Sequence, residues 1–479
     1  MNDEAARHRL TRKPPERVIV AVLAAAGLTS AFMFTLVVPI QAQLPELLNA
    51  SREDTAWVLT ATLLAAAVST PIAGRLGDMY GKRRIVLALL AVMVFGSVIA
   101  ALSDGIATLL VGRVFQGAVT GVVPLGIAIL RDVVHPDRVG ESVAFMSATM
   151  GVGGALGMPI SALITQFADW HGLFWAAGGL GAVVFLLIRW IVPVSVLRTG
   201  GRFDFLGAVG LALGLLGILL AISRGSAWGW GSPLTLGTGL GGVAVLVWWS
   251  WYQWRTASPL QDLRVATRPA VLLTNIASVA FGFALFASNV AYPQILELPA
   301  AAGGFGLSLF QASLIVMPAG VLMMVLSPIA GRLAGTVGPK WLLVWGASAL
   351  IAAYGFSLGF ADQVWQILIA NLLIGVGIGF SFAAMPMLIL RSVPQSETGA
   401  SNGLNALCRS LGTSGAAAVI GAVLASDTID YGGLPVPTPE AFQLSFAIGI
   451  GAAVVALVVA LFIPTARDPH EAHPSLPGR

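Results

Sequence analysis

Fourteen apolar stretches recur along this chain of 479 residues, and each is long enough to cross a membrane. At ~1.5 Å per residue, about 20 residues of helix span the ~30 Å hydrocarbon core of a bilayer. Backbone N–H and C=O groups find no water there, so each stretch is predicted to be a helix. The predicted spans are residues 18–42, 55–76, 85–103, 107–131, 141–167, 172–194, 205–222, 234–253, 270–295, 308–332, 341–360, 364–391, 400–424 and 442–464.

Composition agrees with this assignment and excludes several other classes of protein. Hydrophobic residues make up 57% of the chain and charged residues 10%, which is unlike a water-soluble domain. Neither the G-x-x-x-x-G-K-[ST] nucleotide motif nor the H-E-x-x-H metal motif occurs, and one cysteine, Cys408, makes no disulfide framework. We expect an all-α polytopic membrane protein that is not an enzyme, with no cofactor, no metal site and no nucleic-acid partner.

The distribution of basic residues predicts the orientation. An even number of spans places both termini on one side of the membrane, and of the 26 basic residues only Arg52 and Arg224 are predicted in loops on the other side. Because Lys and Arg concentrate in cytoplasmic loops, both termini are expected in the cytoplasm. The excess of Arg over Lys suggests a bacterial genome, so the expected location is the bacterial cytoplasmic (inner) membrane, with a monomer as the expected state.

The six residues PIAGRL occur twice, 257 positions apart, which indicates an internal repeat. Matches that keep nearly this offset are Pro71 with Pro328, Pro39 with Pro293, Leu130-Arg131 with Leu390-Arg391, and Gly140 with Gly399. We therefore predict two related six-helix halves. The expected parts are a tail (1–17), a first bundle (18–194), an inserted helix pair (205–254), a second bundle (269–464) and a tail (465–479).

The loop after the first PIAGRL carries the most specific motif of the chain. The run Gly74-Arg75-Leu76-Gly77-Asp78-Met79-Tyr80-Gly81-Lys82-Arg83-Arg84 resembles the G-x-L-x-D-x-x-G-[RK]-[RK] signature of the major facilitator superfamily, in particular its fourteen-helix drug:proton antiporter branch. The resemblance implies a gating loop between the second and third helices. Its glycines permit close helix approach, and Asp78 can lie near a positive helix end. The alternative is a basic loop that only sets topology.

Helix 107–131 resembles the family's R-x-x-x-Q/G motif, with Arg113 and Gln116 on one helical face. An arginine this deep in a span costs ~2.5–3.5 kcal/mol on insertion scales, so it should face a polar interior. The resemblance implies a role in proton coupling. The alternative is an arginine that snorkels or binds a carbonyl group.

Helix 141–167 resembles the family's antiporter motif. Gly153 and Gly157 have the usual spacing, and Pro159 arrives one residue later than in the motif. Small residues at this spacing let helices pack closely, and proline can bend a helix. Glycine-rich packing without a further role is the alternative.

The sequence does not identify a single residue as the proton carrier. The family's first helix commonly carries an aspartate for this purpose, and Leu36 occupies the corresponding position here. We hypothesise that Arg113 and a carboxylate that reaches it share proton coupling; the carboxylates considered are Glu141, Asp132 and Asp78. Acids at helix ends are also common as solvated caps or ion-pair partners.

A polar stripe in helix 400–424 is predicted to line a cavity between the halves. Asn402, Asn405 and Arg409 follow helical spacing there, although capping between helices is the alternative. The other predicted cavity residues are Gln41, Trp57 and Tyr292. Aromatic and methionine side chains in the same helices suit bulky amphiphilic molecules better than sugars.

Three functions remain open at this point. The first is a secondary active exporter of amphiphilic or hydrophobic small molecules by alternating access, in exchange for protons. The second is a lipid or metabolite transporter, a uniporter or symporter without the usual coupling, which Leu36 and the displaced Pro159 favour. The third is a membrane sensor or scaffold on a transporter fold, for which the sequence offers no signalling domain.

Overall fold

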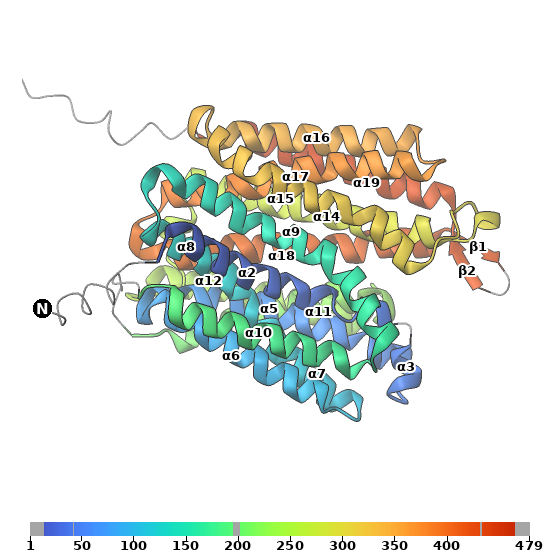
Figure 1. Cartoon of the computed structure of the whole chain (residues 1–479), viewed down its shortest axis with the longest axis horizontal. Helices are drawn as coiled ribbons and strands as arrows, with labels where there is room; N and C mark the ends of the chain where they lie inside the picture. The colour runs from blue at the N-terminus through green and yellow to red at the C-terminus, as the bar shows by residue number, and fades with distance from the viewer. Residues whose placement is uncertain (1–13, 42, 195–201, 432–433, 465–479) are drawn as a thin grey trace, which may run out of the picture.

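The computed structural model describes residues 14–41, 43–194, 202–431 and 434–464, so most of the two predicted tails lies outside it. Within these ranges, fourteen helices are long and apolar enough to cross a membrane, which confirms the predicted number. The protein is thus a multi-pass membrane protein. Its helices lie side by side along the long axis of the molecule (Figure 1).

The fourteen spans agree with the predicted order. They are α2 (Glu16–Thr35), α5 (Trp57–Tyr80), α6 (Lys82–Ala101), α7 with α8 (Ile106–Gly117 and Val122–Val133), α9 (Pro136–Phe167), α10 (His171–Ile191), α11 (Phe205–Trp228), α12 (Pro233–Arg255), α14 (Pro269–Glu297), α15 (Leu309–Thr336), α16 (Pro339–Gly359), α17 (Val364–Ser392), α18 (Thr398–Ser426) and α19 (Pro439–Phe462).

Short elements that the sequence did not predict lie between the spans or, in the case of η2, inside the fourth span. They are α3 (Leu44–Leu47), α4 (Arg52–Thr55), α13 (Leu263–Ala266), the 3-10 turns η1 (Val38–Ile40), η2 (Ala118–Gly121), η3 (Ala300–Ala302) and η4 (Gln395–Glu397), and the strands β1 (Thr428–Tyr431) and β2 (Leu434–Pro437). The two strands pair antiparallel, with Thr428 opposite Pro437. We call the end of the bundle with α3 and this hairpin the far end (Figure 1).

The opposite end, where α2 begins and α19 ends, is called the basic end. Its loops and helix termini carry most of the described Lys and Arg residues: Lys82, Arg83, Arg84, Arg131, Arg138, Arg202, Arg255, Arg264, Arg268, Arg332, Lys340 and Arg391. The asymmetry that predicted the orientation is therefore present in the folded chain.

Each six-helix half packs mainly on itself. In the first half α2 packs on α9, and α6 packs on α7 and α10. In the second half α14 packs on α18 and α19, and α16 packs on α17 and α19. The halves meet mainly through two helix pairs, α5 with α18 and α9 with α15, and also where α9 contacts α17 and α8 contacts α18. This pairing matches the repeat, since α5 corresponds to α15 and α9 to α18.

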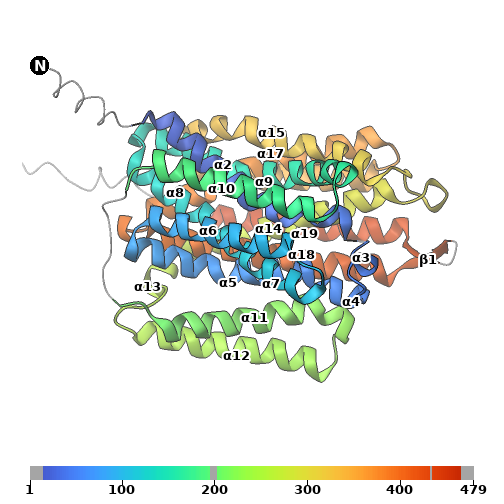
Figure 2. The same cartoon turned by 60° about the horizontal axis from the view of Figure 1, so that its bottom comes forward.

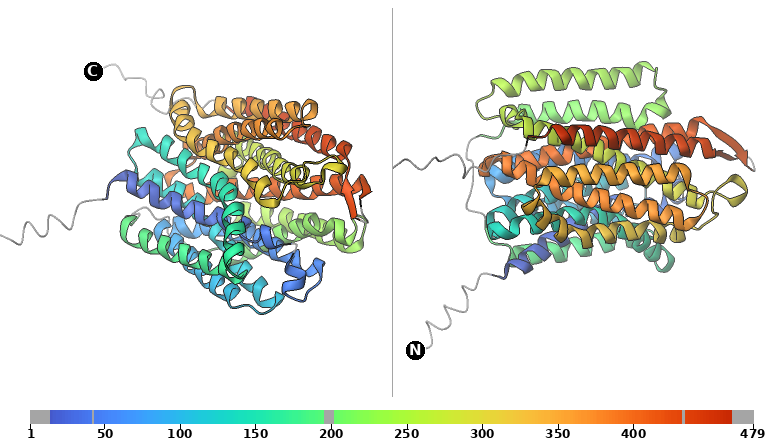
Figure 3. Two further views of the ribbon diagram at one scale, coloured as in Figure 1. Left: turned by 45° about the vertical axis from the view of Figure 1, so that its right-hand side comes forward. Right: turned by 90° about the horizontal axis from the view of Figure 1, so that it is seen from above.

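The inserted pair, α11 and α12, forms a hairpin outside the two halves (Figures 2 and 3). Of these two helices, α11 contacts both α5 and α18, so the hairpin covers one seam between the halves. Leu211 and Leu215 of α11 belong to one buried cluster with Leu64 of α5 and Leu407 of α18. Glycines bring α11 and α12 close, since a Cβ on Gly242 would lie 2.7 Å from the amide nitrogen of Ile218.

The fourth span, predicted as residues 107–131, is confirmed as Ile106–Val133, with the 3-10 turn η2 between α7 and α8. Pro124 just beyond this turn cannot donate a backbone hydrogen bond to Thr120. One predicted boundary is wrong. Arg224 was predicted in a loop, but α11 continues past it. Its side chain is buried, with the guanidinium carbon 4.4 Å from the ring centroid of Trp57.

Asp204 anchors the hairpin at the basic end. As N-cap of α11, its carboxylate accepts hydrogen bonds from the backbone N–H of Gly207 at 2.8 Å and of Leu260 at 3.3 Å. It also accepts from the hydroxyl of Tyr252 at 3.1 Å and from Nε2 of Gln253 at 2.7 Å. One carboxylate therefore joins the start of α11, the end of α12 and the loop that follows.

We expect Asp204→Ala to destabilise the hairpin by about 1–3 kcal/mol, because charge-assisted hydrogen bonds and a helix cap are lost together. Thermal melting followed by tryptophan fluorescence would report this, since Trp249 donates to the Gly207 carbonyl in the same region. Asp362→Ala, in an exposed loop at the far end, is the matched control. Equal melting curves for the two variants would contradict the anchoring role.

Candidate functional site

The first contact between the halves at the basic end joins α5 and α18 through glycines. A Cβ placed on Gly399 would lie only 2.7 Å from the carbonyl oxygen of Gly74, so neither position has room for a side chain. One turn further along α18, a Cβ on Gly403 would lie 3.0 Å from the Thr70 carbonyl oxygen. Backbone thus meets backbone over more than one turn, as small residues permit.

Asp78 adds a polar bond to this contact. Its carboxylate is 2% exposed and accepts hydrogen bonds from the backbone N–H of Gly399 at 3.1 Å and of Ala400 at 2.8 Å. These N–H groups belong to the first turn of α18, where helices have no internal acceptors and a positive dipole end. A carboxylate of the first half therefore caps a helix of the second half.

A second contact, between α9 and α15, repeats this geometry. A Cβ on Gly331 would lie 2.7 Å from the carbonyl oxygen of Gly140, and the pair Gly331 and Gly140 corresponds in the repeat to Gly74 and Gly399. Nearby, Nη2 of Arg332 lies 3.4 Å from Oε1 of Glu141 across the same boundary. Both of these side chains are exposed, so their ion pair contributes little.

The two contacts differ at one position. Where α5 has Asp78, the second copy has Gly335 in α15, and a Cβ there would meet nothing within 4 Å. Only the α5 contact therefore has a carboxylate that links the halves through helix N–H groups.

The rest of the loop motif holds the first half together. Gly77 packs against Leu125, and Gly81 has φ of 106°, a left-handed conformation that favours glycine. Lys82 and Asp132 form an ion pair of 2.6 Å with side chains only 1% and 6% exposed. The remaining motif cations differ: Arg75 is half-buried, Arg83 donates to the Arg189 carbonyl, and Arg84 is exposed.

Arg113 lies in α7, the part of the fourth span nearer the far end, and contacts several helices. It donates from Nε to the Val58 carbonyl at 3.2 Å and from Nη2 to the Met33 carbonyl at 3.0 Å. Its Nη1 donates to Oε1 of Gln116 at 2.8 Å, and Gln116 donates to Oγ of Ser97 at 2.8 Å. This fully buried cluster joins α2, α5, α6 and α7.

The idea that Asp132, Glu141 or Asp78 reaches Arg113 is wrong for this conformation. These carboxylates bond to Lys82, Arg332 and the α18 amides at the basic end. The chain from Arg113 to Asp132 rises roughly 28 Å at ~1.5 Å per residue, so the two cannot touch.

The antiporter-motif glycines pack α9 on α2. A Cβ on Gly153 would lie 2.5 Å from Cβ of Ala31, and one on Gly157 would collide with the side chain of Thr35. Pro159 lies inside α9 just beyond them. These residues allow close packing within the first half.

Three of the predicted cavity residues have other partners. Tyr292 is wholly buried within the second half, where its hydroxyl lies 2.9 Å from Oγ of Ser357 and its ring packs on Phe446, so its assignment to the cavity is wrong. Asn405 donates from Nδ2 to Oδ1 of Asn275 at 3.0 Å and to Oγ of Ser278 at 2.7 Å, which ties α18 to α14. Asn402 donates from Nδ2 to the Thr398 carbonyl of its own helix.

The other three lie at or near a boundary. Gln41 is half-buried after η1, at the far end, and Trp57 contacts Arg224 of the inserted hairpin. Arg409, in the middle of α18, reaches α9 of the other half: its Nη2 lies 3.1 Å from Sδ of Met150. The sequence did not identify Met150 or Arg332 as interface residues, although the repeat places Arg332 opposite Arg75.

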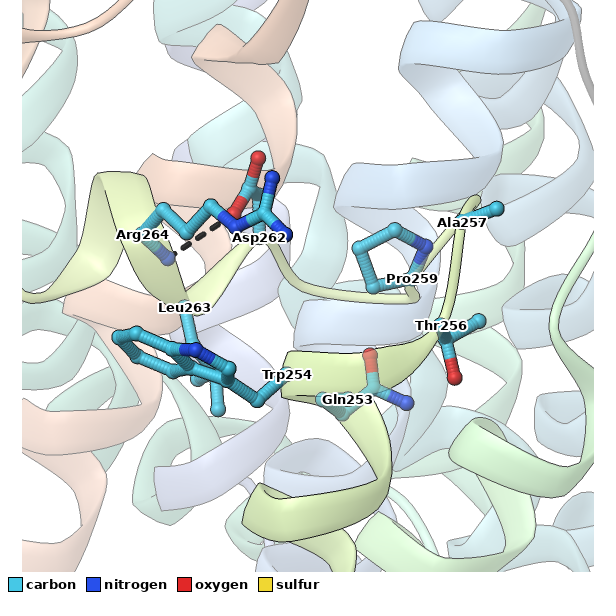
Figure 4. Close-up of a pocket in the computed structure, with 8 residues that line it drawn as sticks. All are labelled: Gln253, Trp254, Thr256, Ala257, Pro259, Asp262, Leu263 and Arg264. Atoms are coloured by element: carbon cyan, nitrogen blue, oxygen red, sulfur yellow. Dashed lines mark hydrogen bonds between the residues drawn. The ribbon is translucent and has the colours of Figure 1, made fainter.

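A small pocket lies apart from these contacts, at the basic end where α12 meets α13 (Figure 4). Its lining residues are Gln253, Trp254, Thr256, Ala257, Pro259, Asp262, Leu263 and Arg264. Asp262 there accepts from the backbone N–H of Arg264 at 2.9 Å as the cap of α13. The pocket adjoins the hairpin's anchor and is separate from the boundary between the halves.

Comparisons with known proteins agree with this architecture. A family model described as Major Facilitator Superfamily matches residues 23–417 and 274–478. The human organic anion transporter MFSD10 superposes with a TM-score of 0.63 at 16% identity, covering 94% of this chain and 100% of that one. The proton:xylose symporter XylE superposes with a TM-score of 0.65 at 14% identity, covering 94% and 96%. At these identities the likeness shows the fold alone.

Curated relatives are more similar in sequence. The tetracenomycin C resistance and export protein of Streptomyces glaucescens is 26% identical over 79% of this chain and 70% of its own length. The lincomycin resistance protein LmrB of Bacillus subtilis is 25% identical over 88% and 90%. An uncharacterised transporter of Mycobacterium tuberculosis is 25% identical over 88% of the chain, which spans 62% of that protein's length. This chain is therefore a member of the major facilitator superfamily of membrane transporters, with relatives that include antibiotic resistance proteins.

Proposed function

We propose that this protein exports amphiphilic or hydrophobic small molecules by alternating access, in exchange for protons. The observation that carries the proposal is the closed contact at the basic end, where Gly74 meets Gly399 and Asp78 caps α18. Backbone contacts and two hydrogen bonds can separate without unfolding either half. The named activities of the relatives, resistance to and export of antibiotics, support export as the direction.

The basic end is proposed to face the cytoplasm of a bacterium, with both termini there, because Lys and Arg concentrate on that side of inner-membrane proteins. The conformation described would then be one in which access from the cytoplasm is closed. Separation of α5 from α18 and of α9 from α15 at that end would open it.

Asp78 is proposed as the group that couples protons to this motion. Its carboxylate is buried at the boundary and accepts both hydrogen bonds, which are stronger when the carboxylate is charged. Protonation would remove that charge and weaken its attraction to the positive end of α18. Proton binding would then favour the state in which the basic end is open.

The other coupling residues are given supporting roles in this proposal. Lys82 and Asp132 hold the loop in place, Glu141 pairs with Arg332 at the second contact, and Arg113 with Gln116 fixes α7 against its neighbours. Gly153 and Gly157 would let α9 shift along α2 as the halves rock.

Transport without proton coupling is the second candidate function. Leu36, at the position where an acid would be expected in the first helix, is wholly buried among apolar residues. A uniporter or a lipid transporter would need no carboxylate there. The two candidates differ in whether a pH gradient drives accumulation.

We expect Gly74→Val to hold the basic end open, because its side chain would collide with the Gly399 backbone. Cysteines introduced at the exposed positions Tyr80 and Ser396, in a Cys408→Ser background, would each carry a spin label. Double electron–electron resonance would then measure the distance between the two labels across the contact. The variant should shift the distribution to longer distances. Gly335→Val, with open space at its Cβ, should leave it unchanged, and an unchanged Gly74→Val distribution would count against the gate.

We expect Asp78→Asn to lower substrate accumulation driven by a pH gradient about tenfold, because a charge-assisted hydrogen bond stabilises by roughly 1.5–3 kcal/mol. Proteoliposomes with an imposed gradient and a panel of lipophilic cations, neutral amphiphiles and lipids would provide the assay. Gly335→Ala is the matched control at the repeat position. Wild-type transport at the same rate with and without the pH gradient would favour the second candidate function, transport without proton coupling.

A further inference from the structure

Arg409 differs from every other residue at the boundary because it is a charged group in the middle of the membrane-spanning region. It lies near the centre of α18 and is 7% exposed. Its guanidinium lies 4.7 Å from the ring centroid of Phe382 in α17 and contacts Sδ of Met150 in α9. Three helices from both halves therefore meet around one cation.

The protein gives this cation little compensation. A guanidinium has five N–H donors, whereas a thioether sulfur is a weak acceptor. Among the described residues, the hydrogen bond of Arg409 goes to that sulfur, and no ion pair includes it. A buried charge normally requires a partner, so the balance of charge at this site is incomplete.

Arg113 provides an internal contrast. It is wholly buried, and its donors are taken by the carbonyls of Val58 and Met33 and by Oε1 of Gln116. It also lies within one half, whereas Arg409 lies between the halves. The same chemical group is therefore bonded to three oxygen acceptors within one half and to a single sulfur at the boundary between the halves.

No described carboxylate is available to complete the site. In the fourteen spans, the Asp and Glu residues that the structure describes all lie within a few turns of a helix end, and the middle of each span has none. Asp78 and Glu141 are both engaged at the basic end. A counter-ion at the level of Arg409 must therefore come from outside the described part of the chain.

We propose that Arg409 binds the carboxylate of an amphiphilic organic anion, whose apolar part packs on Phe382 and Met150. The proposal rests on the transport function above and specifies the substrate class at its central site. The guanidinium fork suits a carboxylate in two parallel hydrogen bonds, and aromatic and thioether groups accept varied apolar shapes. The bound anion would replace the sulfur contact and complete the charge balance.

Binding of three pyrene amphiphiles to the purified full chain in lipid nanodiscs tests this. The probes are pyrenebutanoate, pyrenebutanol and pyrenebutyl-trimethylammonium, and energy transfer from protein tryptophan reports binding. We expect the wild type to bind the carboxylate at least about tenfold more tightly than the ammonium probe. Arg409→Gln should lose this preference and keep the affinity for the alcohol within about twofold.

Two further variants separate binding from structure. Arg409→Lys keeps the charge without the planar fork and should fall between wild type and Arg409→Gln. Arg255→Gln removes another arginine that lies over an aromatic ring, Trp251, on the outer helix α12, and should bind all probes like wild type. Equal loss for all three probes in Arg409→Gln, or no carboxylate preference in the wild type, would overturn the proposal.

The outcome is separable from that of the transport proposal. If Arg409 selects the carboxylate probe but a pH gradient does not drive transport of pyrenebutanoate in proteoliposomes, the proposal of export by proton exchange is wrong and the proposed binding site is supported. If a pH gradient drives transport of the ammonium probe, while pyrenebutanoate is neither bound nor transported, the proposed binding site is wrong and the export proposal is supported.

Discussion

The close backbone contact between α5 and α18 is the constraint on which the arrangement of the two halves depends. Within a bilayer, lipid tails are as apolar as the helix surfaces, so burial of leucines does not hold helices together as it does in water. Association relies on close packing of small residues and on polar bonds, and Gly74, Gly399 and Asp78 supply both at one end of the boundary. A contact of this kind is specific and involves few bonds.

The duplication explains both the symmetry and its loss. Gly331 and Gly140 reproduce the glycine contact in the other helix pair, so the geometry of this contact occurs twice. The polar part is not, because Gly335 stands where Asp78 would be and an exposed pair, Arg332 with Glu141, lies nearby instead. Both seams have the same backbone contact, but only the α5–α18 seam also has a buried carboxylate.

Much of the fold could be predicted because membrane spans follow from length and hydropathy, and the repeat follows from identical residues. The partners of polar residues could not. Helical spacing shows which residues share a face, but Tyr292 and Asn405 turned out to face neighbours within their own half, whereas Arg409 faces the other half. Arg113 does not contact any of the expected carboxylates, because they lie at the other end of the membrane-spanning region. Spacing on one helical face does not reveal this distance along the span.

Helix α18 contacts or carries both sites that are proposed here to act in transport. Its first turn is held by Asp78 at the basic end, its middle carries Arg409, and α11 of the inserted hairpin packs along its side. If Asp78 is the proton site and Arg409 the substrate site, the two lie on one rigid element, so a proton that releases the end of the helix also moves the cation in its centre. Coupling would then need no carboxylate near the substrate, which is consistent with Leu36 in the first helix and with spans whose middles have no described acid.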